Sequence, residues 1–133
     1  RLDLRRFDDG REALLDAAHN PDGAAALASY LDDTWPDKPP LVFGAMRDKD
    51  VRGMFRVLLP AIGSLVLTRA SSPRSADPSA LAELAREVAP TLPIVIEGSP
   101  ASALAAAWRR APRIVVGGSI FLVGDVMKEI DGP

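Results

Sequence analysis

Six short apolar segments alternate along this chain with longer segments whose apolar residues recur at helical spacing. Four of the short segments are unbroken apolar triplets, at residues 41–43, 65–67, 94–96 and 114–116. Runs of this kind are typical of parallel strands, which are buried on both sides when helices cover both faces of the sheet. The alternation of such strands with helices of about ten residues or more predicts βαβ units.

The first two predicted strands differ from the others because a turn, and not a helix, separates them. Residues 2–7 alternate roughly between apolar and charged side chains, Asp9-Gly10 is a hairpin turn signal, and a second strand follows at residues 12–16. We therefore predict an α/β fold: a Rossmann-like, mostly parallel sheet with helices on both faces and one antiparallel edge from an N-terminal hairpin.

Three of the predicted helices begin with a capping residue followed by proline. These pairs are Asn20-Pro21, Asp77-Pro78 and Ser99-Pro100. A side-chain oxygen at the cap accepts one of the N–H groups that the first turn leaves unpaired, and proline has no N–H to leave unpaired. The pairs therefore predict the start of three helices.

The composition narrows the range of partners. A length of 133 residues fits one domain, so we expect a single domain over residues 1–133. The formal net charge is −2 and there is no basic stripe, which argues against nucleic-acid binding. No apolar run approaches the roughly 18 residues of a membrane span, so no membrane partner is expected.

Cysteine is absent from the sequence. This excludes disulfides and thiolate metal sites and fits a reducing compartment, so we expect a cytoplasmic protein. The first residues are charged and contain no signal-type apolar core. Because the chain begins at Arg1 without an initiator methionine, we interpret it as a piece of a larger protein.

Polar residues and glycines follow most of the predicted strands at the point where each strand ends. In open α/β sheets, ligands bind beyond the carboxyl ends of the strands, so these residues should gather along one edge. They are Asp16 and His19, then Gly44, Arg47, Asp48 and Lys49, then Thr68, Arg69, Ser71 and Arg74, and finally Gly117, Gly118 and Ser119.

Asp16 and His19, the only histidine, each allow two interpretations. Asp16 could accept hydrogen bonds from ribose hydroxyls, or it could cap the N–H of Ala18 or His19. His19 could donate to a carboxylate ligand, or it could be a packed, hydrogen-bonded residue near a helix start. One histidine with one aspartate and no cysteine is too few ligands for a metal site, so none is predicted.

The remaining candidates are equally open. Lys49 could pair with an anionic substrate, or it could belong to a solvated charge cluster in which Asp48 and Asp50 cap the next helix. Arg74 could reach the ligand-binding edge of the sheet, or it could hydrogen-bond to nearby backbone carbonyl groups. Residues 117–119 could let the backbone approach an anion at a helix start, or could form a tight turn. Neither a dinucleotide fingerprint, a P-loop nor a G-x-S-x-G motif is present.

Four stretches taken together resemble the C-terminal domain of folylpolyglutamate synthase/dihydrofolate synthase, in the Mur ligase family. They are LDAAHNPDGA at residues 15–24, VFGAMRDKD at 42–50, PRS at 73–75 and GSIFLVG at 118–124. Ala17 stands where many relatives carry glycine. The stretches span nearly the whole chain in the expected order.

The resemblance implies an ATP-dependent acid–amino-acid ligase. ATP phosphorylates a carboxylate of a folate or of its pteroate precursor, and the amino group of glutamate attacks the acyl phosphate. In this family the phosphate loop and the Mg²⁺ ligands belong to a central domain that precedes this one. The implied partners are therefore folate or dihydropteroate, glutamate and the central domain, and this chain alone is expected to be inactive.

The resemblance also implies roles for individual residues. Asp16 matches the aspartate that contacts the nucleotide, and Arg1 falls where an arginine of the interdomain linker contacts ATP. His19 and Ser119 match positions associated with the incoming glutamate, and Lys49 is placed to pair with a glutamate carboxylate. Arg74 matches a family pattern without an assigned role. No catalytic group and no metal ligand is implied within this domain.

Three other functions are compatible with the sequence. A cell-wall Mur ligase would add an amino acid to a different precursor, although the loop at residues 46–50 favours the folate branch. A nucleotide- or anion-binding module without ligase activity is a second alternative. The third is a structural βα domain whose edge residues only cap helices.

Overall fold

The chain folds around one six-stranded sheet in the computed structural model, which describes residues 2–132. The strand order is β1-β2-β6-β3-β4-β5. β1 and β2 pair antiparallel, and the other neighbouring strands pair parallel, which confirms the predicted sheet and its antiparallel edge. The strands are β1 (Leu2–Arg6), β2 (Glu12–Asp16), β3 (Pro40–Phe43), β4 (Ser64–Leu67), β5 (Ile94–Ile96) and β6 (Arg113–Gly117), and the helices are α1 (Pro21–Thr34), α2 (Val51–Leu58), α3 (Pro78–Val88), α4 (Pro100–Arg110) and α5 (Ile120–Asp131).

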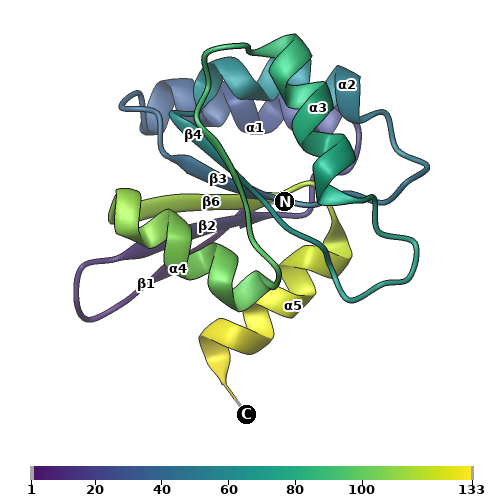
Figure 1. The fold of residues 1–133 in the computed structure, drawn as a ribbon. Coiled ribbons are helices and arrows are strands. Elements are labelled where there is room, and N and C mark those ends of the chain that lie inside the picture. The colour runs from purple at the N-terminus through teal and green to yellow at the C-terminus, as the bar shows by residue number, and fades with distance from the viewer. Residues whose placement is uncertain (1, 133) are drawn as a thin grey trace.

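Helices cover both faces of the sheet, as the apolar strand runs predict. α1, α2 and α3 lie on one face, and α4 and α5 lie on the other (Figure 1). Adjacent strand residues point to opposite faces, so Leu14 packs in the core under α1 while Leu15 packs in the core under α4 and α5. Both leucines are almost fully buried.

Each described helix has a side-chain cap at its N-terminus. The predicted caps Asn20, Asp77 and Ser99 are confirmed. Asn20 Oδ1 accepts from Gly23 N at 2.8 Å, and Asp77 Oδ1 accepts from Ser79 N at 2.9 Å. Ser99 and Ser102 form a capping box, in which each side chain hydrogen-bonds to the backbone of the other. A 3₁₀ turn at Leu59–Ala61 was not predicted. It follows α2 because Pro60 lacks an N–H and cannot continue the ladder of an α-helix.

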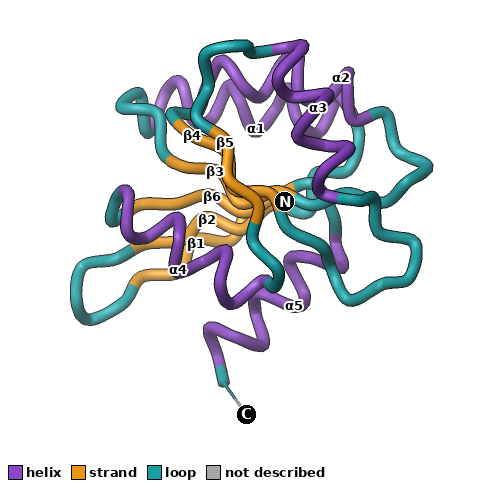
Figure 2. The backbone as a smooth tube through the Cα atoms, in the orientation of Figure 1, coloured by secondary structure: helices purple, strands orange, loops and turns teal. Residues whose placement is uncertain are grey.

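Loops connect the strands and helices at both ends of the sheet (Figure 2). The loops after β3 and β4 and the start of α5 lie together on the right of Figure 1. Residues 2–132 contain no helix with the length and apolar character needed to cross a bilayer.

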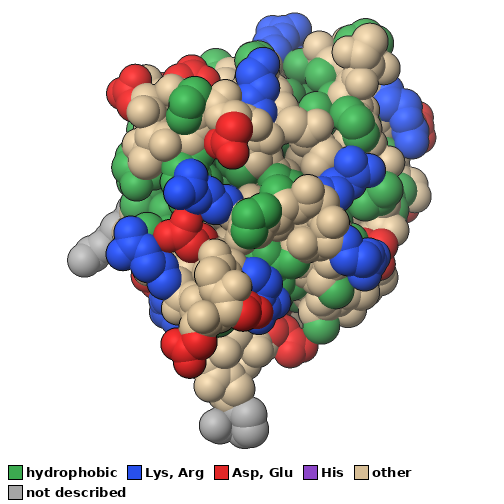
Figure 3. All heavy atoms as spheres, turned by 90° about the vertical axis from the view of Figure 1, so that its left-hand side faces the viewer, with side chains coloured by type: hydrophobic (Ala, Val, Ile, Leu, Met, Phe, Trp, Pro, Cys, Tyr) green, Lys and Arg blue, Asp and Glu red, His purple; other side chains and the backbone are tan. Residues whose placement is uncertain are grey.

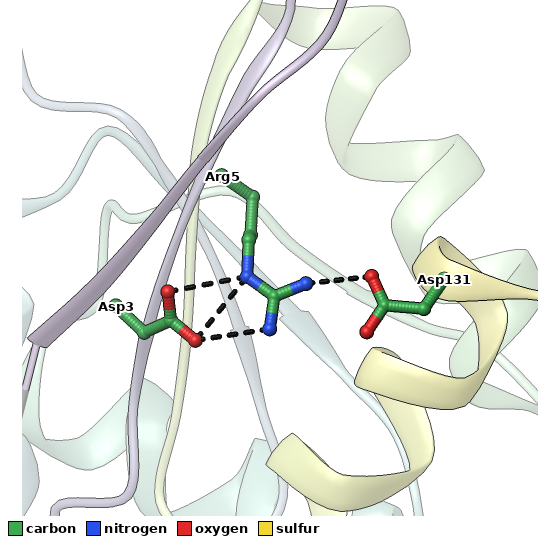
Figure 4. A network of polar contacts seen from close by, with 3 residues as sticks. All are labelled: Asp3, Arg5 and Asp131. Carbon is green, nitrogen blue, oxygen red and sulfur yellow. Dashed lines mark hydrogen bonds and ion pairs between the residues drawn. The ribbon is translucent and has the colours of Figure 1, made fainter.

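An arginine ties the edge strand to the end of the last helix (Figure 4). Arg5 Nε and Nη2 donate to the Asp3 carboxylate at 3.1–3.2 Å, and Arg5 Nη1 donates to Asp131 Oδ1 at 2.6 Å. The hydrogen bonds to Asp3 raise the pKa of Arg5 above its ordinary value, and the Asp131 carboxylate adds to this effect. Charges on both sides of the guanidinium therefore fix α5 against β1.

Charged side chains of both signs are interspersed on the end of the molecule that carries the hairpin turn, on the left of Figure 1 (Figure 3). Glu12, at the start of β2, lies between two arginines of neighbouring strands. Its carboxylate accepts from Arg6 Nε and from Arg113 Nε, each at 2.9 Å. The hydrogen bond from Arg6, reinforced by Arg113, lowers the pKa of Glu12.

The lowered pKa makes stability depend on pH. The folded pKa of Glu12 lies below its unfolded value, so its stabilisation is present above the unfolded pKa of about 4.3 and is lost as pH falls through the folded pKa. Glu12→Gln should lower the free energy of unfolding by about 1 kcal/mol at pH 7 and by less near pH 3. Urea unfolding of the chain at both pH values checks this. Glu83→Gln, on the exposed face of α3, is the control and should change neither value.

Candidate functional site

The sheet has a switch point where β2 and β6 lie side by side. The helix after β2 packs on one face of the sheet, and the helix after β6 packs on the other (Figure 1). Such a divergence opens a crevice beyond the carboxyl ends of the strands, where ligands bind in open α/β sheets. Here the β2–α1 loop, residues 17–20, and the β6–α5 loop, residues 118–119, flank this point, and residues of both loops line a cavity there.

Gly118 joins these two loops. Its backbone N–H donates to the carbonyl oxygen of Ala18 at 3.1 Å. Its φ is +104°, and a Cβ at this position would overlap the carbonyl oxygen of Gly44 and lie 2.7 Å from the Phe43 ring. Only glycine tolerates both the conformation and the space. These contacts are those of a tight turn, so they explain why position 118 needs glycine without invoking a ligand.

A first cavity of about 380 Å³ opens beside the β2–α1 loop. Leu2, Ala26 and Leu27 form its apolar wall, and Asp16 is the one lining residue of fixed charge among those described. Asp16 is 5% exposed, and its Oδ1 accepts from Ala18 N at 3.1 Å. The capping interpretation of Asp16 is therefore confirmed. A carboxylate has about four acceptor positions, so this bond is compatible with contacts to hydroxyl groups in the cavity.

A second cavity, of about 220 Å³, lies on the other side of the β2–α1 loop. Lys49, Arg74 and Ser119 contribute its polar groups, and none of its described lining residues is acidic. Lys49 Nζ lies 3.9 Å from the Asp48 carboxylate, which is a loose ion pair, and Asp50 caps α2. The second cavity therefore suits an anion.

Backbone pairing brings Lys49 and Arg74 together although they follow different strands. Met46 and Ser75 form an antiparallel bridge, and Arg47 N donates to the carbonyl oxygen of Arg74 at 2.9 Å. The loop after β4 is thereby folded back over the loop after β3. This places Arg74 on the second cavity, where the sequence left its role open.

His19 lines both cavities. Its side chain is exposed and therefore not packed, but the expected hydrogen bond near a helix start is present, because its Nδ1 lies 3.1 Å from the carbonyl oxygen of Ala17. The ring is therefore held by its own loop at the boundary between the two cavities.

Ser119 is the N-cap of α5 and is buried. Its Oγ accepts from Phe121 N at 3.0 Å and lies 3.4 Å from Leu122 N. These contacts use the oxygen as an acceptor, so the hydroxyl hydrogen can still be donated towards the second cavity. Ser119 thus has a structural role that does not exclude a binding role.

Ile120 and Phe121 line the second cavity and were not identified as site residues from the sequence. They are 64% and 47% exposed, unusually high for such large apolar side chains. The one signal available in the sequence is that they directly follow a capping serine, which places them in the first turn of a helix at the ligand-binding edge.

Three of the predicted edge residues point elsewhere. Thr68 is buried and its Oγ1 donates to Glu97 O at 3.0 Å, Arg69 lies 3.7 Å from Asp77, and Ser71 bonds Asp125. They follow β4 at the predicted edge of the sheet but line neither of the two cavities, because β4 lies beyond β3 and its immediate loop faces β5 and α5. Arg47 and Asp48 line a separate cavity of about 200 Å³ with Arg74. Arg1 lies outside the described residues.

Metal ligands are not clustered in the described part of the chain. No group of three or more histidine, aspartate or glutamate side chains within residues 2–132 could hold a metal ion.

Comparison with known proteins identifies relatives over most of the chain. The family described as "Mur ligase, glutamate ligase domain" matches residues 1–124. A probable bifunctional folylpolyglutamate synthase/dihydropteroate synthase of Haloferax volcanii is 36% identical over 115 residues, which are 84% of this chain and 14% of that protein. The dihydrofolate synthase/folylpolyglutamate synthase of Mycobacterium tuberculosis is 40% identical over 85 residues, 63% of this chain and 18% of that protein.

The fold is also that of a solved relative. The folylpolyglutamate synthase of Mycobacterium tuberculosis, solved with ADP and AMPPCP, superposes with a TM-score of 0.84 at 31% identity, over 98% of this chain and 32% of that one. The chain thus spans less than a fifth of the two curated relatives and about a third of the solved one. It belongs to the Mur ligase family, as a glutamate ligase domain.

Proposed function

We propose that this chain is a single domain of an ATP-dependent ligase that joins glutamate to a folate, and to dihydropteroate if the enzyme is bifunctional. The observation that carries the proposal is the pair of cavities that meet at His19: one has a carboxylate and an apolar wall, and the other has two cationic side chains. A ligase that uses ATP to join an anionic amino acid to another substrate needs neighbouring sites for the nucleotide and for the amino acid. The family and its named relatives supply the substrate class.

Glutamate fits the second cavity by charge. Its two carboxylates can pair with Lys49 and Arg74, and the hydroxyl of Ser119 can donate a further hydrogen bond. Charge-assisted hydrogen bonds of this kind are short and directional, so they would fix the amino group for attack on the acyl phosphate. The exposed Ile120 and Phe121 would become covered when the rest of the enzyme closes over the site, excluding water.

The nucleotide fits the first cavity. The Asp16 carboxylate can accept from ribose hydroxyls, and Leu2, Ala26 and Leu27 form a wall suited to a flat apolar surface. Arg1, at the junction with the preceding part of the protein, is proposed to contact ATP as well. The phosphates and Mg²⁺ would be held mainly by a preceding P-loop domain, and Mg²⁺ would offset the charge of the transferred phosphoryl group. The predicted cytoplasmic location stays a prediction.

Incorporation of labelled glutamate tests this proposal. Full-length protein is incubated with ATP, Mg²⁺, radiolabelled glutamate and either a reduced folate or dihydropteroate, and the folate products are separated and counted. Label in the folate fraction that depends on ATP supports the proposal. Incorporation into a cell-wall precursor and not into folates would instead identify the alternative Mur ligase.

Loss of Lys49 should weaken glutamate binding selectively. Lys49→Ala in the full-length enzyme removes a charged partner worth about 1.5–3 kcal/mol, so the KM for glutamate should rise by at least about tenfold while the KM for ATP changes little. Lys128→Ala, on the exposed part of α5 outside the second cavity, is the matched control. Equal glutamate KM values in the two variants would exclude Lys49 from the glutamate site.

A further inference from the structure

His19 occupies the one place from which a side chain can act on groups from both cavities. Among the described residues, Ala17 and His19 are the two that line both cavities, and of these two only His19 has a functional side chain. The inference below rests on the proposed function, because it concerns the meeting point of an acyl phosphate and the amino group of glutamate. Glutamate bound in the second cavity would lie beside His19, and the acyl phosphate would reach it from the preceding domain that holds the phosphates.

The hydrogen bond to Ala17 fixes which ring nitrogen is available. A carbonyl oxygen can only accept, so the 3.1 Å contact with Nδ1 of His19 favours the tautomer that carries its hydrogen on Nδ1. In the neutral ring Nε2 is then unprotonated and is the basic atom. The other charged groups of the described residues that line the two cavities are Lys49 and Arg74 in the second cavity and Asp16 in the first. Of these, the two cations cannot take a proton, and Asp16 is turned to Ala18 on the nucleotide side.

We propose that Nε2 of His19 is the base that removes a proton from the α-ammonium group of glutamate. The ammonium group passes one proton to Nε2 and becomes a neutral amine. The amine nitrogen then bonds to the acyl phosphate carbon, the bond from that carbon to the bridging oxygen breaks, and a second proton of the nitrogen leaves with the phosphate. The products are the amide, hydrogen phosphate and a protonated His19, which returns its proton to solvent because the side chain is exposed.

Lys49 and Arg74 assist this transfer. Two cations beside the ammonium group favour its neutral form, because like charges in one site raise each other's energy. The same residues that hold the carboxylates of glutamate would therefore drive its amino group towards the reactive state.

Chemical rescue in the full-length enzyme tests the proposal. His19→Ala should lower kcat for glutamate addition by about 100-fold or more, with a smaller change in the KM for glutamate. Added imidazole should restore kcat, since the exposed site can admit it, whereas Ser119→Ala should not respond to imidazole. A loss confined to KM, or a loss of kcat that imidazole does not restore, would overturn the proposal.

Two further measurements distinguish a failure of the proposed ligase function from a failure of the proposed role of His19. Hydroxylamine traps an acyl phosphate as a hydroxamate without glutamate, and His19→Ala should form hydroxamate as fast as wild type. If wild type forms none with any folate substrate, the proposed function itself fails, and this inference with it. The proposal predicts that kcat of wild type falls in acid and that this fall is absent in His19→Gln, whose side chain is not a base; the same acidic fall in both enzymes would also overturn the proposal.

Discussion

Replacing Gly118 with alanine should destabilise the domain by about 3 kcal/mol, because a positive φ costs an L-residue about 1–2 kcal/mol and an overpacked site adds a similar amount. The added Cβ would meet the Gly44 carbonyl oxygen and the Phe43 ring, which is part of the core and cannot move away cheaply. The urea midpoint of the isolated chain, followed by circular dichroism, measures the effect.

A second glycine of the same region provides the control. Gly124 lies inside α5, and a Cβ there meets nothing within 4 Å. Gly124→Ala should leave stability unchanged or raise it by about 0.5–1 kcal/mol, since alanine is the better helix former. Equal midpoints for the two variants would mean that the β6–α5 turn is more adaptable than its backbone contacts indicate.

Replacing Asp16 with alanine should raise the KM for ATP of the full-length enzyme by about 30-fold, since a hydrogen bond to a charged group contributes about 1.5–3 kcal/mol. The loss of the Ala18 bond would add a structural effect. Asp16→Asn separates the two, because its amide oxygen can still accept from Ala18 N while the charge is gone.

The comparison of the two variants decides the role of Asp16. We expect Asp16→Asn to lose less stability than Asp16→Ala and still to bind ATP several-fold more weakly. Asp33→Asn, an exposed residue near the end of α1, is the control for charge alone. If the KM for ATP were unchanged in both Asp16 variants, the role of Asp16 would be limited to capping the N–H of Ala18.

Local rules predict the elements of this fold well. Apolar runs marked the parallel strands, and Asn20, Asp77 and Ser99 marked helix starts, because each signal depends on a few neighbouring residues. The antiparallel edge followed from the Asp9-Gly10 turn in the same way. The 3₁₀ turn after α2 was not predicted, because Pro60 ends the α-helical hydrogen bonding without specifying the backbone conformation that follows.

The site was only partly predictable because it depends on the order of the strands. Residues after each strand can be read from the sequence, but the order β2-β6-β3-β4 decides which of them are neighbours. That order excludes Thr68 and Arg69, while the bridge between Met46 and Ser75 brings Arg74 back. The exposure of Phe121 is likewise a property of the assembled fold.

The central claim is that this crevice delivers glutamate to an acyl phosphate. The most direct test follows phosphate release from ATP by the full-length protein with a reduced folate or dihydropteroate, with and without glutamate, for wild type and His19→Ala. We predict steady release in wild type that requires both substrates, and its collapse in the variant. Phosphate release that ignores folate, or that survives unchanged in His19→Ala with glutamate saturating, would contradict the account.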